Sequence, residues 1–398
     1  MNPTMIDRKT IDETAMLRPL ILRCRSLQAM IVKELLQLFR DYVLLFFVVY
    51  AFTADVYWAG SGVTLSLNQA ALSIHDEDRS TASRQLIDGF HPPYFKNIGE
   101  VGDLRDGTQL LDAGQATLFF NIPPEFQKSL AAPRQTEVQM QVDATNSVLG
   151  LLASTYATQI VTSYGLNESL TRNGISPNRI QTLPGIVDDR RVWFNPNQTD
   201  SWFMSITELL NIVTVLAILL PAAAMVREKE KGTIEQLIVS PLSPLEIMFP
   251  KVIAMTAVIV AGTAVCLFAV IRPLFHVPFR GSLLLFFFVT TIYSWTSAGI
   301  GLFVASISRN LAQASMLVIL MLAPILFLSG VWTPPEILPA WLRLGMYVSP
   351  MHYYIDLSLG ILLKGADWQI LWKQIVALSS LGIVVFAAGL WSFRRNFQ

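Results

Sequence analysis

Long apolar segments with very few charged residues dominate the chain. A transmembrane helix needs about 20 predominantly apolar residues, and core helices of soluble proteins rarely run so long without a charge. We interpret six windows as membrane spans: Tyr42–Ala59, Phe203–Val226, Phe249–Ile271, Leu283–Ser306, Leu311–Gly330 and Ile370–Phe393. The pattern therefore predicts a membrane α-helical fold with six transmembrane helices.

The segment Gly60–Ser201 interrupts this pattern, because it is polar and its periodicity is mixed. Clean alternation over Glu137–Asp143 favours a half-buried strand. Further strands are expected over Val63–Ile74 and Ala116–Asn121, and helices over Arg79–Phe90, Glu125–Leu130 and Ser147–Tyr164. Strands that alternate with helices predict an α/β domain of about 140 residues, inserted between the first two spans and large enough to bury a core.

Composition agrees with a membrane protein and narrows its functions. Hydrophobic residues make up 53% of the chain and charged residues 15%, against roughly 25% charged in soluble domains. The net charge is zero and no basic cluster is interleaved with aromatics, so nucleic-acid binding has no support. Cys24 and Cys266 fall in different compartments and cannot pair. No metal-ligand spacing is present, and we interpret His75 and His91 as turn residues.

The distribution of Lys and Arg predicts the orientation. Positive charges near span ends favour the cytoplasm, and residues 1–41 hold basic residues without the apolar core of a signal peptide. We therefore expect a cytoplasmic arm at 1–41, both termini inside, and Gly60–Ser201 outside. Four basic residues contradict this bias and fall outside: Arg272, Arg280, Arg343 and Lys364.

Two segments predict structure at the membrane surface. Apolar residues between Leu27 and Leu38 recur at helical spacing, which indicates an amphipathic helix on the cytoplasmic surface. The alternative is the cytoplasmic end of one long first helix. Residues 331–369 are rich in proline and aromatics, and a seventh span there would place Arg394 and Arg395 outside. A re-entrant external segment fits better, because non-helical backbone at membrane depth must be covered by protein or water.

The charged segment 227–245, between the second and third spans, has the form of a docking helix. Thr233-Ile-Glu-Gln236 is a capping-box pattern that starts a helix, and Ser240-Pro241 ends it. An apolar face then forms at helical spacing, suited to a groove on a partner protein. An ordinary charged loop is the alternative. The predicted docking residues are Glu228, Glu230, Gly232, Thr233, Ile234, Glu235, Leu237 and Ile238, with the glutamates in polar contacts, Gly232 at the turn, and the three aliphatic residues as the apolar face.

The segment Glu228-x-Glu-x-Gly-Thr-x-Glu235-x-Leu-x-x-Ser-Pro241 resembles the coupling segment of ABC-2 type permeases, the membrane subunits of bacterial ABC exporters. Three further stretches resemble the same family in order: Lys33–Asp41, Asp76–Arg84 and Arg191–Asn197. The resemblance is greatest to drug-efflux-type permeases with a large external domain. It implies a coupling helix seated on a separate cytoplasmic ATPase, two permease halves around one path, and a bacterial inner-membrane location.

The sequence contains no Walker A pattern, so we expect no cofactor on this chain and assign ATP and Mg²⁺ to the partner ATPase. Other expected partners are a second permease copy or paralogue and membrane lipid. By analogy, the external domain suggests a periplasmic adaptor. The expected function is therefore that of a non-enzymatic permease subunit that exports amphipathic or lipophilic compounds.

Two carboxylates lie within predicted spans, Asp55 and Glu208. Charged residues within a membrane are costly, which makes them candidates for a translocation path. The alternative is that they reach interfacial water or pair with external arginines. They also support a rival function, an ion-coupled secondary transporter. A membrane sensor with an external ligand-binding domain is a second rival.

Overall fold

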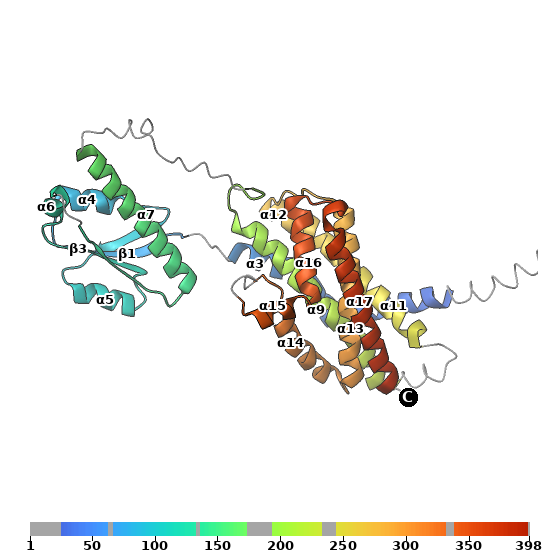
Figure 1. Cartoon of the computed structure of the whole chain (residues 1–398). Helices are drawn as coiled ribbons and strands as arrows, with labels where there is room; N and C mark the ends of the chain where they lie inside the picture. Colours follow the sequence, from blue (N-terminus) through green and yellow to red (C-terminus); the bar gives the residue numbers. More distant parts are fainter. Residues whose placement is uncertain are drawn as a thin grey trace, which may run out of the picture. The chain divides into compact units, whose positions relative to one another are not determined.

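The computed structural model describes residues 25–62, 67–132, 136–172, 193–232, 244–331 and 338–396. The chain forms two compact units, one of Thr64–Arg191 and one of Met1–Val63 with Val192–Gln398 (Figure 1). The second of these, which we call the helical unit, contains the apolar helices. The first, which we call the sheet unit, contains the strands.

The helical unit begins with a helix over residues 25–39, which we call the arm helix. The elements that follow are α2 Tyr42–Tyr50, η1 Ala51–Asp55, α3 Val56–Gly62, α9 Asp200–Glu230, α11 Pro244–Val265, η2 Cys266–Ile271, α12 Arg272–Phe275, α13 Leu283–Ile307, α14 Leu311–Phe327, α15 Ala340–Met346, α16 Pro350–Leu359, η4 Gly360–Lys364 and α17 Trp368–Asn396. The π-helical turns η1 and η2 continue the helices that precede them.

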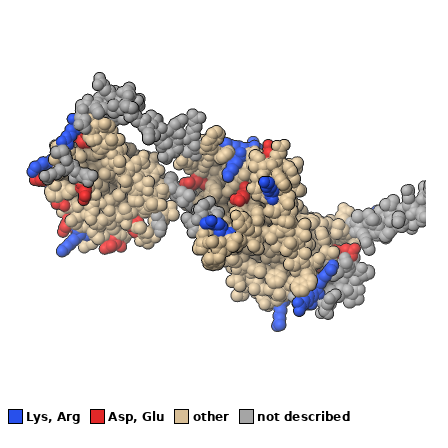
Figure 2. All heavy atoms as spheres, in the orientation of Figure 1, with Lys and Arg blue, Asp and Glu red and all other residues tan. Residues whose placement is uncertain are grey.

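Five stretches of helix in the described residues are long and apolar enough to cross a membrane: Tyr42–Gly62, Asp200–Glu230, Leu245–Phe275, Leu283–Ile307 and Trp368–Arg395. Each of these candidates overlaps one of the predicted spans. The sixth, predicted to reach Gly330, is a helix of only 17 residues that contains Pro324 and ends at Phe327. On the face shown in Figure 2, Lys, Arg, Asp and Glu gather toward the ends of the helical unit, and its sides are nearly free of them.

Helix α9 forms the centre of the helical unit. In its most apolar window 83% of the residues are buried, and it contacts α3, α11, α13 and α14. Close approach to α13 requires Gly301, because a Cβ there would lie 2.3 Å from the Ile218 carbonyl oxygen. Thr214 Oγ1 of α9 lies 2.8 Å from the Tyr293 hydroxyl of α13. Helix α9 is therefore held against its neighbours by close packing and a buried hydrogen bond.

The segment predicted as re-entrant contains two helices in its described part. Helix α16 packs against both α13 and α17. Its Tyr354 ring stacks on Tyr293 with ring centroids 4.0 Å apart. The chain then turns back at Gly365, where φ is +70°, and enters α17. Because α16 packs against the long helices α13 and α17, this segment is covered by protein, as a re-entrant segment must be. Its depth in a membrane stays a prediction.

The sheet unit has the α/β character expected from its sequence. Its strands are β1 Ala70–Asp76, β2 Phe95–Glu100, β3 Leu118–Ile122 and β4 Gln139–Val142, in the order β2-β1-β3-β4. Both neighbours of β1 run parallel to it, whereas β4 is antiparallel to β3. The helices are α4 Thr81–Asp88, α5 Leu104–Asp112, α6 Phe126–Ala131 and α7 Ser147–Arg172. Helix α7 contributes the buried Ala153 and Ala157 to the core around β1 and β3.

The expected strands at Glu137–Asp143 and Ala116–Asn121 are confirmed as β4 and β3, and the helix over Arg79–Phe90 as α4. Strand β2 was not predicted. Only its first residue, Phe95, is buried, so this edge strand carries no apolar alternation. Helix α5 was not predicted either.

The motif that resembles the start of the family's external domain is a turn between β1 and α4. Asp76 Oδ1 accepts hydrogen bonds from the backbone N–H groups of Asp78 and Arg79, both at 3.0 Å. Its other oxygen accepts from Ser83 Oγ at 2.7 Å. Ser80 caps α4 by accepting from the Ser83 N–H. The residue types in this motif thus serve local folding.

Candidate coupling site

The last turn of α9, Arg227–Glu230, joins five other elements of the helical unit. Successive residues of an α-helix are turned by about 100° from each other, so four consecutive side chains point in different directions. Each of the four contacts a different part of the structure. We call these four residues the collar.

Glu228 is the buried centre of the collar. Its Oε1 atom lies 2.7 Å from Lys251 Nζ of α11 and 2.8 Å from Lys33 Nζ of the arm helix. Lys251 Nζ also lies 2.6 Å from Glu34 Oε1, and the Lys251 side chain is only 2% exposed. Two lysines and two glutamates therefore form one compact ionic cluster, in which charges are paired as burial requires.

The pKa of Lys33 reflects this cluster. Partial burial acts to lower the pKa of its ammonium group, but the hydrogen bond and charge of Glu228, with the charge of Glu34, outweigh burial and leave the pKa raised. Lys33 therefore stays protonated at neutral pH, and its link between the arm helix and α9 persists.

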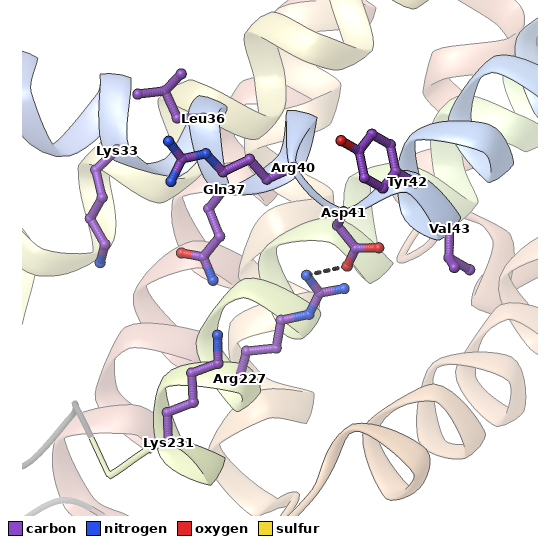
Figure 3. A pocket seen from close by; sticks show the side chains of 9 residues that line it. All are labelled: Lys33, Leu36, Gln37, Arg40, Asp41, Tyr42, Val43, Arg227 and Lys231. Atoms are coloured by element: carbon purple, nitrogen blue, oxygen red, sulfur yellow. Dashed lines mark ion pairs between the residues drawn. The ribbon is translucent and has the colours of Figure 1, made fainter.

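Arg227 holds the start of the first span. Its Nη1 atom lies 2.7 Å from Asp41 Oδ2, and the dashed line in Figure 3 marks this ion pair. The other Asp41 oxygen accepts from the Leu44 N–H at 3.1 Å and caps α2. One carboxylate thus connects the beginning of α2 to the end of α9.

Lys229 contacts the end of α13 and Glu230 contacts the start of α14, the two helices on either side of Arg309. Lys229 Nζ donates to the carbonyl oxygens of Ala305, Ser306 and Ser308, at the end of α13, where a helix leaves carbonyls without intrahelical partners. Glu230 Oε1 accepts from the Leu311 N–H at 2.8 Å, in the first turn of α14. Each charge matches the helix end that it contacts.

Of the predicted docking residues, those up to Gly232 lie in the described part of the structure and those after it do not. Gly232 has φ +66°, a left-handed conformation that favours glycine, so it does permit a turn directly after the collar. Thr233, Ile234, Glu235, Leu237 and Ile238 lie outside the described residues. Glu228 and Glu230 engage partners within the chain, whereas we had expected them to contact a partner protein.

The collar thus joins one turn of α9 to the arm helix, α2, α11, α13 and α14. Residues 42–391 match the ABC-2 family transporter protein family. The chain belongs to the ABC-2 family of transporter proteins. It is a multi-pass membrane protein of ABC permease type, and the resemblance drawn from the motifs is confirmed.

Relatives of this ABC-2 protein cover nearly its whole length. The inner membrane transport permease YhhJ of Escherichia coli is 33% identical over 366 residues, which are 92% of this chain and 96% of YhhJ. The probable multidrug ABC transporter permease YbhR of the same organism is 29% identical over 84% of this chain and 88% of YbhR. YbhS, with the same description, is 25% identical over 87% and 90%.

Asp55 and Glu208 are brought near each other. Asp55 lies in the π-helical turn η1, which packs against α9. Glu208 lies on α9, where its Oε2 atom accepts from Asn211 Nδ2 at 3.0 Å. Asp55 and Glu208 are both only partly buried, and their place on a translocation path stays a prediction.

Sequence reasoning missed Glu34 and Lys251 as site residues. Lys251 lies eight positions into the apolar helix α11, where the other charged residue is Glu246 in the first turn, and charges in such helices mark functional positions. Glu34 lies within the Lys33–Asp41 stretch that carried part of the family resemblance. Both signals were present. Their pairing could not be predicted, because the two residues are 217 positions apart.

Proposed function

We propose that this ABC-2 permease is the membrane subunit of a bacterial ABC exporter, energised by a separate cytoplasmic ATPase that docks on residues 227–245. The observation that supports this proposal most strongly is the set of contacts made by the collar. A docking segment attached directly to Gly232 would transmit its displacement into Arg227–Glu230, and the collar links that point to the arm helix, α2, α11, α13 and α14. This is the coupling that an external motor requires.

The chain is assigned no enzymatic step. The printed sequence contains no Walker A pattern, so ATP and Mg²⁺ are assigned to the partner. Two permease copies, or this chain and a paralogue, form the translocation path between them. YbhR and YbhS, described as multidrug permeases, support amphipathic or lipophilic cargo moving outward, and a periplasmic adaptor is the further partner.

We place six spans in the inner membrane, with α14 as the fifth in sequence and both termini in the cytoplasm. A helix of 17 residues is about 25 Å long at 1.5 Å per residue, which calls for local thinning of a bilayer core of about 30 Å. The sheet unit then lies in the periplasm, between the first and second spans.

Labelling of single cysteines tests this topology. In a background with Cys24 and Cys266 replaced by serine, we expect Lys128→Cys in the sheet unit and Val348→Cys after α15 to react with an impermeant maleimide in intact spheroplasts. Arg395→Cys at the end of α17 is expected to react only after permeabilisation. All three positions are exposed. Reaction of Arg395→Cys in intact spheroplasts would overturn the topology and, with it, the docking proposal.

Asp55 and Glu208 are proposed to line the exit path. A carboxylate in a low-dielectric path attracts a cation far more strongly than it does in water. We expect Asp55→Asn and Glu208→Gln to be expressed normally, because each removes an intramembrane charge, and to reduce export of a cationic compound by about tenfold.

A neutral compound of similar size is the control for these variants, and its export should change little. Equal export of both compounds by the double variant would reject the path assignment. It would leave the two carboxylates as interfacial residues and the permease function unaffected.

A further inference from the structure

An open basic pocket lies where the arm helix, the start of α2 and the end of α9 meet. Its volume is about 760 Å³. Figure 3 shows Gln37 from the arm helix directed toward Arg227 of α9 and Lys231, the residue directly after α9, across the same space. The lining also includes Lys33, Leu36, Arg40, Asp41, Tyr42 and Val43. We call this the collar pocket.

The charge of the collar pocket is unbalanced. Four cations line it and only one carboxylate, Asp41, which is paired with Arg227. Lys33 is paired with Glu34 and Glu228. Arg40 and Lys231 are exposed and, among the residues that the structure describes, form no ion pair. Both cations line the collar pocket, and no carboxylate among the described residues is paired with them.

The rim of the collar pocket is apolar on the side of the first span. Tyr42 and Val43 are each 81% exposed and Leu36 is 51% exposed. Tyr42 is also the first residue of the candidate span Tyr42–Gly62. The apolar surface continues along α2, where Phe46 is 71% exposed. Cations and apolar surface therefore meet at the level where a membrane helix leaves the hydrocarbon, which is also where tyrosine is enriched.

We propose that the collar pocket binds the phosphate-bearing headgroup of an anionic phospholipid, with Arg40 and Lys231 on the phosphate and the acyl chains along the exposed face of α2. Basic pockets between transmembrane helices bind anionic headgroups in this way. The exposed apolar rim favours a lipid over an acidic protein segment, because only a lipid covers both the cations and the adjoining face of α2. The assignment to the inner leaflet rests on the proposed topology; binding itself does not.

A phospholipid bound in the collar pocket would also affect the collar itself. A headgroup held by Arg40, directly after the arm helix, and Lys231, directly after α9, would bridge two segments that Lys33 and Arg227 already join. A ligand that binds only the folded junction stabilises it by mass action. Anionic lipid would therefore stiffen the link between the docking segment and the first span.

Binding is tested on the purified full chain in detergent, with no ATPase and no transport measurement, so its outcome is independent of the proposed function. Dioleoylphosphatidylglycerol and dioleoylphosphatidylcholine are titrated separately, and bound lipid is counted by native mass spectrometry. We expect phosphatidylglycerol to bind at least tenfold more tightly. The variant Arg40→Gln/Lys231→Gln should weaken phosphatidylglycerol binding by roughly 10- to 30-fold, since each basic residue contributes about a three- to fivefold effect.

The matched control is Arg394→Gln/Arg395→Gln, which removes two exposed charges at the end of α17, away from the residues that line the pocket. It should bind phosphatidylglycerol as the unmodified chain does. Equal affinity of the unmodified chain for the two lipids would overturn the proposal without any substitution. An equal loss of phosphatidylglycerol affinity in the two double variants would show that general surface charge, and not the collar pocket, attracts the lipid. Displacement of the lipid by millimolar inorganic phosphate would show that the pocket binds a free anion instead.

Discussion

Replacing Lys251 with methionine is expected to lower the thermal unfolding midpoint of the detergent-solubilised permease by roughly 5–10 °C. The substitution removes the cation that lies 2.6 Å from Glu34 and 2.7 Å from Glu228. Both carboxylate side chains are only 4% exposed, and half-exposed Lys33 is the cation of the cluster that remains beside them. Breaking a buried pair from one side costs about 3–5 kcal/mol, and the midpoint shift follows from that loss.

Two further variants separate this effect from a general loss of packing. The triple variant Lys251→Met/Glu34→Gln/Glu228→Gln removes the buried charges together and should recover most of the midpoint, because an uncharged replacement of a buried ion pair is often neutral. Lys128→Met breaks the exposed pair with Glu125 and should change nothing measurable. A Lys251→Met midpoint within about 1 °C of the original would show that the cluster does not stabilise the fold.

The second large effect is expected from Leu237→Asp. Leu237 lies at the centre of the apolar face predicted for the docking helix, and a charge buried there without a partner costs roughly 3 kcal/mol, or about a hundredfold in affinity. The variant should insert into the membrane normally, lose co-purification with the ATPase, and lose transport.

Gln236→Asp provides the matched control for Leu237→Asp. It introduces the same charge one residue earlier, outside the apolar face formed by Ile234, Leu237 and Ile238. Co-purification and transport should persist in this variant. If Leu237→Asp retains both as well, the apolar face is not the docking surface.

The spans were predictable because the requirement for membrane insertion can be read from the residues of each segment alone. About 20 apolar residues without charge are a requirement of the bilayer, and it is met within each segment by itself. The exception is instructive. The window Leu311–Gly330 is largely apolar, but its helix contains Pro324, which has no backbone N–H, and ends at Phe327 after only 17 residues.

For the collar, the sequence predicted the location of the functional segment but not the contacts of its residues. Periodicity and capping patterns pointed to residues 227–245, since they are local signals. The roles of Glu228 and Glu230 depend on partners from distant segments: Lys33 is 195 positions from Glu228, and Leu311 is 81 positions from Glu230. A charged residue beside a membrane span looks the same in sequence whether it faces a partner protein or a buried lysine.

Reconstitution of transport tests the central proposal most directly. The permease and its ATPase are purified separately and incorporated together or singly into proteoliposomes, and transport of a fluorescent amphipathic compound is followed. We predict that transport requires both proteins and ATP, and that replacing the Walker A lysine of the ATPase abolishes it. Transport by the permease alone, driven by a proton or sodium gradient and unaffected by ATP, would contradict the account and establish an ion-coupled transporter.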